Sequence, residues 1–556
     1  MTTEQRAPIR IYDTTLRDGA QREGISLSVD DKLTIAHQLD KLGLSFIEGG
    51  WPGANPKDEQ FFQRLQAVPL RQAEIVAFCS TRRPGVSAAD DPTLRSILAA
   101  STRWVTLFGK SWDFHVTAGL KTTLGENLAM IADSIRYLRQ QGRQVIYDAE
   151  HWFDGYRHNS SYALDTIQAA LQAGAEWIVL CDTNGGTLPH EITPSLQAVR
   201  QMIADHPQCS ARIGIHTHND SGTAVANALA AVQQGAEMVQ GTINGYGERC
   251  GNANLCTLIP NLQLKLGYHC VEPEKLAELT PSSRLISELV NLAPDDHAPF
   301  VGLSAFAHKG GIHVSAVQRD PQTYEHIEPH RVGNQRRIVI SEQSGLSNVL
   351  EKANHCGIDL DKQNPVSRQL LQQLKQLEHQ GYQFEAAEAS FELLLRQALD
   401  QRPSLFELHG FDVHCYCGSL EARQQGGFSS TALATVKVVV GMQEILTAAE
   451  GNGPVSALDA ALRKALVDVY PTIAKFQLTD YKVRILDGKR GTSAKTRVLV
   501  ESSDGQDRWT TVGVSTNIIG ASYQAVAEGI EYGLLRPCFK DSDDCPINIR
   551  AVLNRP

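Results

Sequence analysis

Several features that would identify common classes of protein are missing from this sequence of 556 residues. It has no apolar run long enough to span a membrane, no block dense in Lys and Arg, and no Cys-x-x-Cys pair among its 11 cysteines. The opening residues MTTEQRAPIR lack the apolar core of a secretory signal. With a formal net charge of -10, these absences argue against nucleic acid or a membrane as a partner. We therefore expect a soluble, cytoplasmic protein of two or three domains.

The first 270 residues alternate short apolar runs with longer helical patterns. Eight runs are candidate strands: 9–13, 45–49, 74–79, 103–109, 143–148, 176–181, 211–215 and 236–240. Helical patterns such as 29–42, 122–139 and 188–203 lie between them. Buried strands that are each followed by a helix indicate a parallel α/β fold, and eight such units predict a closed (β/α)8 TIM barrel. An open doubly wound sheet is the alternative, but its Gly-x-Gly-x-x-Gly turn is missing after the first strand.

The segment HTHND follows the seventh candidate strand and contains His216 and His218. Residues two apart in a strand project from the same face, so both imidazoles can reach one point. By itself this pattern could be no more than a polar strand end. A second segment, TTLRDGAQ at 14–21, follows the first strand and supplies the guanidinium of Arg17 and the carboxylate of Asp18. Together the two segments favour a metal site.

Polar residues follow the other candidate strands in the same way. In chain order the clusters are Asp13, Arg17, Asp18 and Gln21; Glu48; Tyr147, Asp148, Glu150 and His151; Asp182, Thr183 and Asn184; His216, His218, Asn219 and Asp220; Asn244, Glu248, Arg249 and Asn252. Any one cluster could simply cap a helix, since Asp, Thr and Asn are common N-caps. Because active sites of TIM barrels form at the C-terminal ends of the strands, their convergence predicts a functional rim.

Five segments, in this order, resemble motifs of the DRE-TIM metallolyases. They are TTLRDGAQ (14–21), LCDTNGG (180–186), HTHND (216–220), GYGERCGNANL (245–255) and FAHKGGIH (306–313). The resemblance is closest to the Claisen-condensing branch, which includes the 2-isopropylmalate, homocitrate and citramalate synthases, and EGGWPGANPKD (48–58) is similar to the last of these. It implies condensation of acetyl-CoA with a 2-oxo acid, pyruvate in the citramalate subgroup. Isopropylmalate or homocitrate synthesis, which differ in the oxo acid, stay open.

The resemblance also implies a set of metal ligands. Asp18, His216 and His218 match the family's ligands, and Asn252 matches an additional amide-oxygen ligand. A mixed donor set of this kind suits Mn²⁺, Mg²⁺ or Zn²⁺. The ion is expected to polarise the ketone of the oxo acid as a Lewis acid. Arg17 is expected to stabilise the developing oxyanion, because a guanidinium keeps its charge; a plain ion pair at the barrel mouth is the alternative.

Substrate-binding and catalytic residues are implied in the same way. Thr183 matches the residue that holds the substrate carboxylate, and Gln21 and Tyr147 are the other candidates for substrate binding, together with Arg17. 

The base that takes a proton from the acetyl methyl group is expected to be a histidine or a carboxylate. His313 in GGIH matches the family's catalytic histidine, Glu150 matches a carboxylate at the site, and Tyr324 matches a tyrosine that the partner subunit of a homodimer contributes. From the sequence alone His308 would serve as well as His313. Two positions depart from the family pattern: Cys256 stands where an acidic residue is common, and HKGG replaces a run of small polar residues.

Beyond residue 270 the patterns change. Residues 271–405 predict a helical linker region, with one long helical pattern over 366–399. Residues 406–540 predict an α+β domain with an internal repeat, in which strands are followed by a small-residue helix twice, and 541–556 form a tail. This domain resembles the family's C-terminal allosteric domain, which implies isoleucine as an effector. A module that only dimerises is the alternative.

Two readings from other functional classes are also open. A barrel hydrolase with a bound metal uses a His-x-His pair too, but usually after the first strand, whereas here the pair follows the seventh. A catalytically inactive amino-acid sensor would keep the C-terminal repeat and could lose the metal ligands, all four of which are present.

Overall fold

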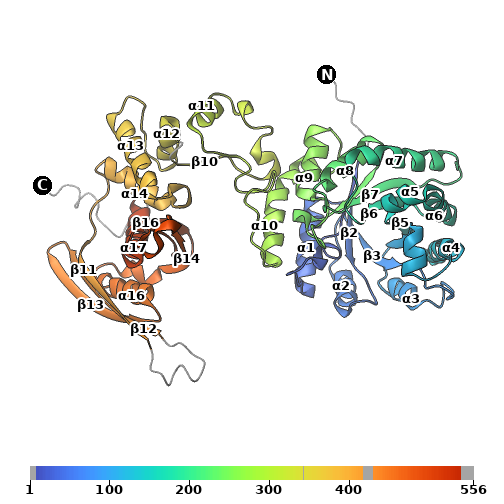
Figure 1. The fold of residues 1–556 in the computed structure, drawn as a ribbon, viewed down its shortest axis with the longest axis horizontal. Coiled ribbons are helices and arrows are strands. Elements are labelled where there is room, and N and C mark those ends of the chain that lie inside the picture. Colours follow the sequence, from blue (N-terminus) through green and yellow to red (C-terminus); the bar gives the residue numbers. More distant parts are fainter. Residues whose placement is uncertain (1–7, 342–343, 418–429, 540–556) are drawn as a thin grey trace. The chain divides into compact units, whose positions relative to one another are not determined.

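The computed structural model describes residues 8–341, 344–417 and 430–539 (Figure 1). These residues form two compact units. The first contains the described residues up to Phe306 together with His326–Arg336, and the second contains Ala307–Glu325 and the described residues from Arg337 onward. The predicted domain boundaries at residues 270 and 405 remain predictions, and the predicted tail 541–556 lies outside the described residues.

The first unit is built on a closed barrel of eight parallel strands, in the order β1 to β8. The strands are β1 (Arg10–Asp13), β2 (Phe46–Gly50), β3 (Glu74–Ser80), β4 (Trp104–Lys110), β5 (Gln144–Glu150), β6 (Trp177–Asp182), β7 (Arg212–Thr217) and β8 (Met238–Gly241). The barrel closes where β1 pairs with β8, with Ile11 opposite Val239. Each predicted strand lies within two residues of an observed one, which confirms the TIM barrel and excludes the open sheet.

The apolar character of the strands follows from burial on both faces. One cluster of side chains fills the barrel interior: Tyr12, Phe46, Val76, Trp104, Ile146, Trp177, Val179, Cys181 and Met238. On β7 the interior position is Gly214, where an added Cβ would lie 2.9 Å from Val179 Cγ2. The alternate side chains face outward and pack against the surrounding helices.

The helices of the first unit are α1 (Val29–Leu42), α2 (Pro56–Ala67), α3 (Pro92–Ala99), α4 (Leu124–Gln140), α5 (Trp152–His158), α6 (Ser160–Ala173), α7 (Pro189–Ala204), α8 (Ala224–Gln233), α9 (Leu255–Pro260) and α10 (Leu279–Leu289). The three predicted helical patterns coincide with α1, α4 and α7 to within two residues. Helix α1 begins with a capping box between Ser28 and Asp31 and ends at Gly43, whose φ of 95° only glycine adopts readily.

The second unit opens with short strands and helices. These are β9 (Ala307–His308), α11 (Gly311–Arg319), β10 (Arg337–Ile338), α12 (Leu346–His355), α13 (Pro365–Gln380) and α14 (Glu388–Ala398). The single long helix predicted over 366–399 is wrong: α13 ends at Gln380, and Gly381 follows with φ 115°. The periodic pattern resumes beyond this glycine, which concealed the break.

The rest of the second unit repeats one arrangement twice. The first copy is the antiparallel sheet β11 (Glu407–Cys417), β12 (Ser430–Val440) and β13 (Gln443–Gly451), followed by α16 (Pro454–Leu466). The second copy is β14 (Gln477–Ile485), β15 (Thr496–Ser503) and β16 (Arg508–Ser515), followed by α17 (Ile518–Phe539). The predicted internal repeat is confirmed, although the sequence interpretation missed β13. Within the described residues no helix combines the length and the apolar character that crossing a membrane requires.

Candidate active site

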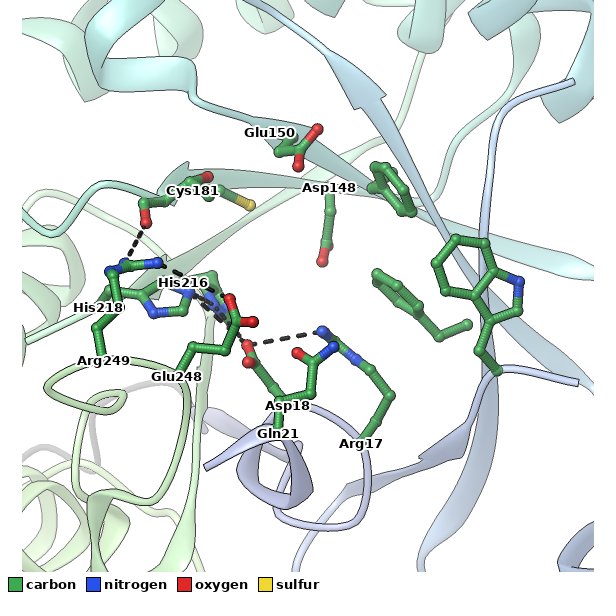
Figure 2. A pocket seen from close by; sticks show the side chains of 14 residues that line it. Arg17, Asp18, Gln21, Asp148, Glu150, Cys181, His216, His218, Glu248 and Arg249 are labelled. Atoms are coloured by element: carbon green, nitrogen blue, oxygen red, sulfur yellow. Dashed lines mark hydrogen bonds and ion pairs between the residues drawn. The ribbon is translucent and has the colours of Figure 1, made fainter. Parts of the chain in front are cut away.

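Three buried side chains from opposite ends of the barrel sequence meet at one point (Figure 2). The Nε2 atoms of His216 and His218 lie 3.2 Å apart, and Asp18 Oδ2 lies 3.4 Å from the first and 3.7 Å from the second. Ligands about 2.1 Å from a shared ion are separated by roughly 3.0 Å in an octahedral and 3.4 Å in a tetrahedral shell. Among the described residues, this is the one cluster of three His, Cys, Asp or Glu side chains close enough to hold an ion.

A hydrogen-bonded chain fixes the tautomer of His216. Its Nδ1 lies 2.8 Å from the amide oxygen of Gln240, which can only accept, so Nδ1 carries the hydrogen. The amide nitrogen of Gln240 donates in turn to Asp148 Oδ1 at 3.1 Å. The lone pair on Nε2 therefore faces the cluster, as a metal ligand requires.

The side chain of Asn252 completes the cluster. Its Nδ2 lies 2.9 Å from Asp18 Oδ2 and 3.4 Å from His216 Nε2, while its buried Oδ1 has no partner within the described parts of the chain. A 180° flip of the Asn252 side-chain amide exchanges Nδ2 with Oδ1 and directs the oxygen at the point where the three side chains meet. The orphaned oxygen and the position of the group both fit an additional amide-oxygen ligand.

Charges within the cluster favour the forms that bind a cation. Burial opposes ionisation of Asp18, but Arg17 and His216 hold its pKa well below the usual range. Burial, assisted by His216, lowers the pKa of His218 to about 4, so this imidazole is neutral at pH 7. Burial also disfavours the charged form of His216, yet Asp18 raises its pKa. A bound cation replaces that proton with a larger positive charge.

Arg17 is held next to the cluster by the carboxylate of Glu48, which the sequence placed on the predicted rim without assigning it a role. Its Nε lies 2.6 Å from Oε2 of Glu48, and its guanidinium carbon lies 3.8 Å above the ring of Phe78. Glu48 is fully buried, and its other oxygen accepts a hydrogen bond of 2.6 Å from Tyr12. The sequence feature that pointed to Glu48 is the presence of a charged residue at the end of an otherwise apolar predicted strand.

A cavity of about 240 Å³ opens beside these groups (Figure 2). Its lining residues are Arg17, Asp18, Gln21, Trp51, Phe78, Phe108, Asp148, Glu150, Cys181, Thr183, His216, His218, Glu248 and Arg249. One wall is aromatic: Phe78 and Phe108 stack with centroids 5.2 Å apart, and Trp51 stands edge-on to both at 5.7 Å. The cavity thus has polar groups around the cluster and an apolar wall of fixed shape.

Two predicted site residues have partners on the rim of this cavity. Glu150 forms an ion pair with Lys110. Thr183 accepts a hydrogen bond of 2.9 Å on its Oγ1 from the backbone N–H of His151, a residue with φ 56°. Because that N–H occupies a lone pair of Oγ1, the hydroxyl of Thr183 is left to donate its own hydrogen elsewhere.

The structure brings most of the predicted site residues together. The cavity is lined by Arg17, Asp18, Gln21, Glu150, Thr183, His216 and His218, and Asn252 adjoins them. Tyr147 lies outside the cavity, fully buried in the layer between strands and helices, because side chains alternate along β5. Its neighbour Asp148, which the sequence placed on the predicted rim without assigning it a role, faces the cavity instead. A role of Tyr147 in substrate binding stays a prediction.

The remaining two candidates belong to the other compact unit. His313 and Tyr324 lie in Ala307–Glu325, and their rings stack with centroids 4.2 Å apart. Their catalytic roles stay predictions.

Comparison with known proteins relates the whole chain to one group of enzymes. Residues 8–285 match the HMGL-like family, 300–382 match the homocitrate synthase post-HMGL domain-like family, and 385–534 match the LeuA allosteric (dimerisation) domain. The chain is 71% identical to an (R)-citramalate synthase of Synechocystis sp., over 94% of this chain and 96% of that one. It is 51% identical to one from Aquifex aeolicus, over 95% and 98%. A probable 2-isopropylmalate synthase of Methanopyrus kandleri is 31% identical, over 94% and 97%.

Proposed function

Since the chain belongs to the family of the (R)-citramalate synthases, we propose that it condenses acetyl-CoA with pyruvate and water to give citramalate and CoA. This would be the first step of a route from pyruvate to isoleucine. The observation that carries the proposal is the placement of the Asp18, His216 and His218 cluster opposite an aromatic wall, in a cavity of about 240 Å³. A small 2-oxo acid can reach the cluster in this cavity. The side chain of a longer 2-oxo acid would contact the rings of the aromatic wall.

The donor set suits a divalent cation. Four residues would hold it: Asp18, His216, His218 and Asn252. When bound, the ion would polarise the ketone of pyruvate as a Lewis acid. Mn²⁺, Mg²⁺ and Zn²⁺ all fit carboxylate, imidazole and amide donors.

The other side chains in the cavity would position the substrate and stabilise charge. Arg17, fixed by Glu48, presents a permanent positive charge to the ketone oxygen as it becomes an alkoxide. The hydroxyl of Thr183 is free to donate to the substrate carboxylate, as is the amide of Gln21. These groups would hold pyruvate with its ketone carbon exposed to attack.

In the proposed reaction, a base removes a proton from the methyl group of acetyl-CoA. The resulting carbon bonds to the ketone carbon of pyruvate, and the ketone oxygen takes a proton to become the tertiary hydroxyl. Water then cleaves the thioester and releases the thiol of CoA. Glu150 lies in the cavity and is one candidate base, while His313 and Tyr324 are assigned to catalysis by the family resemblance.

Isopropylmalate and homocitrate synthesis are the alternatives within the family, and they require a larger oxo acid. A pocket discriminates one methylene by about 1–3 kcal/mol, so the rings of Trp51, Phe78 and Phe108 can account for a strong preference for pyruvate. Initial rates of thiol release with acetyl-CoA and pyruvate, 2-oxobutanoate, 2-oxoisovalerate or 2-oxoglutarate test this. We expect pyruvate to give the highest kcat/KM. A higher value with 2-oxoisovalerate or 2-oxoglutarate would reassign the substrate.

The C-terminal domain of the chain is proposed to regulate and to dimerise. The match to the LeuA allosteric (dimerisation) domain at residues 385–534 supports a homodimer with an allosteric site. We propose isoleucine as the effector, because it is the end product of the proposed route. We expect isoleucine, but not leucine or valine at the same concentration, to inhibit thiol release, and sedimentation to give twice the chain mass. Inhibition by none of the three would leave this domain a dimerisation module.

A further inference from the structure

Thr183, which follows β6, is held from two sides by residues of other loops on the rim of the barrel. On one side, the backbone N–H of His151, directly after β5, donates to its Oγ1 at 2.9 Å. On the other side, Nη2 of Arg249, in the loop after β8, donates to its backbone oxygen at 2.7 Å. Contacts from two segments that are far apart in the sequence therefore converge on this one residue.

The guanidinium of Arg249 is oriented by a carboxylate. Its Nε and Nη2 donate to the two carboxylate oxygens of Asp220, in the loop after β7, at 2.8 and 3.0 Å. A two-point contact of this kind fixes the plane of the guanidinium, because its donors form a rigid fork. The side chain lies on the wall of the cavity beside the metal cluster, with Nη2 directed at Thr183 (Figure 2). Because Asp220 balances its charge, Arg249 is better suited to hold this loop than to bind the substrate carboxylate itself.

Both residues that contact Thr183 have a backbone conformation that side chains disfavour. His151 and Arg249 each have a φ of 56°, in the left-handed region. Eight of the described residues other than glycine have a positive φ, and two of these eight are the partners of Thr183. At His151 this conformation lets the chain turn from β5 into α5 while the N–H stays directed at Thr183. Strain of this kind persists only where the surroundings impose it, and it gathers at functional sites.

The loop that carries Thr183 is also packed tightly onto the loop that carries Asp220. Gly185 has a φ of 64°, and an added Cβ would lie 2.4 Å from Oδ2 of Asp220 and 2.8 Å from its backbone nitrogen. The backbone oxygen of Gly185 accepts a hydrogen bond of 3.0 Å from the N–H of Ser221. Asp220 therefore contacts both the guanidinium of Arg249 and the loop that Arg249 holds.

Resting on the proposed function, we infer that Arg249 and His151 are positioning residues for the carboxylate of the 2-oxo acid and that both act through Thr183. The N–H of His151 occupies a lone pair of the Thr183 hydroxyl, which leaves the hydrogen of that hydroxyl for an acceptor in the cavity. Arg249 holds the backbone from which the hydroxyl projects, and a β-branched side chain has few rotamers. The substrate carboxylate then contacts a donor whose direction is set before binding.

Steady-state kinetics of the full-length, metal-loaded protein test the role of Arg249, with the 2-oxo acid that wild type prefers. Arg249→Ala should raise the KM for the oxo acid at least tenfold, while kcat and the KM for acetyl-CoA change by less than threefold. Arg103→Ala is the matched control and should retain the wild-type KM. Arg103 is also exposed and paired with a carboxylate, that of Glu74, but it precedes β4, at the opposite mouth of the barrel. A KM within twofold of wild type in Arg249→Ala would overturn the inference.

A double-mutant cycle tests whether Arg249 acts through Thr183. Thr183→Val removes the hydroxyl with little change of shape and should itself raise the KM for the oxo acid. Adding Arg249→Ala to Thr183→Val should raise this KM by less than a further twofold, because no hydroxyl is left to position. Effects that multiply in the double variant would indicate that Arg249 acts on the substrate by another route and would overturn the inference, as would an unaltered KM in Thr183→Val.

Two substitutions of His151 separate the role of its backbone from that of its ring. His151→Gly and His151→Val both lack the imidazole, but glycine adopts a positive φ readily and a β-branched residue does not. The KM for the oxo acid should be at least fivefold higher in His151→Val than in His151→Gly, and equal values would overturn the role of His151. Failure of the proposed function is distinct, because it would appear in wild type alone, as no release of thiol with any 2-oxo acid.

Discussion

Arg17 and Glu48 form a buried ion pair in which Nε lies 2.6 Å from Oε2, and the guanidinium rests 3.8 Å above the ring of Phe78. Glu48 is fully buried, and Arg17, Tyr12 and Thr14 all donate hydrogen bonds to its carboxylate. The pair fixes the orientation of the guanidinium before substrate arrives, and such preorganisation is a large contribution to catalysis in many enzymes.

Replacing Glu48 by Gln should therefore remove the ion pair that orients the guanidinium of Arg17, while Arg17 itself is retained. Glu48→Gln retains the shape of the side chain but not its charge, and we expect kcat to fall by about 100-fold or more. Metal content, measured after dialysis, should stay at the wild-type level, since Glu48 is not a predicted ligand. A kcat within about threefold of wild type would show that Arg17 needs no such support.

Because the cluster is the predicted metal site, we expect removal of one of its imidazoles to abolish both ion binding and catalytic activity. His216→Ala should retain the circular dichroism of the folded protein, lose its bound divalent ion and release no detectable thiol. The control is His190→Ala, because His190 is exposed on α7 and lies outside the cavity beside the cluster. Wild-type turnover by His216→Ala would remove this residue from the ligand set.

The aromatic wall predicts that substrate size is controlled by the ring of Phe108. Phe108→Ala removes a ring that stacks on Phe78 and contacts Trp51, so the cavity gains room along its aromatic wall. The kcat/KM for 2-oxobutanoate relative to pyruvate should rise by roughly 10- to 100-fold. Phe114→Ala, which truncates a phenylalanine that is 54% exposed and outside the cavity, should leave the ratio unaltered. An unaltered ratio in Phe108→Ala would place the size filter elsewhere.

A pH dependence is predicted for the C-terminal repeat. Shielding from water raises the pKa of Glu528 on α17 from 4.5 to about 7, although Ser390 donates to it at 2.5 Å and Arg402 lies nearby. The folded state therefore binds the proton more tightly than the unfolded state does. The stability this contributes is fully present below about pH 4.5 and is lost as the pH rises through 7, at most about 3 kcal/mol.

Hydrogen exchange of peptides from β16 and α17, corrected for the intrinsic rate, measures this effect in the full chain. The opening free energy of wild type should fall between pH 5 and 8, and Glu528→Gln should make it nearly constant. The same slope in both proteins would assign the dependence to another group.

The barrel and the core of its site could be predicted because both follow from local patterns. Runs of Val, Ile and Leu located the strands, and the rule that functional groups gather at their C-terminal ends joined Asp18 to His216 across most of the barrel sequence. The direction in which the side chains of β5 point was harder to predict from the sequence. Tyr147 and Asp148 are adjacent polar residues, and only the position of the cavity shows that Asp148 faces it.

Other features depend on contacts between segments that share no motif. The end of α13 at Gly381 could not be read from the helical pattern, because that pattern continues on both sides of the glycine. The buried ion pair joins Arg17, in the turn after β1, to Glu48 on β2, and no spacing rule connects these two positions. Such sites require the fold before they can be recognised.

The central claim is that a divalent ion held by Asp18 and the two histidines activates pyruvate for condensation with acetyl-CoA. Its most direct test is the rate of CoA thiol release by wild-type protein stripped of metal by a chelator, before and after a divalent ion is restored. We predict no pyruvate-dependent release from the stripped protein and full recovery on addition of Mn²⁺, Mg²⁺ or Zn²⁺. Pyruvate-dependent release at the original rate from protein shown to contain no metal would contradict the account.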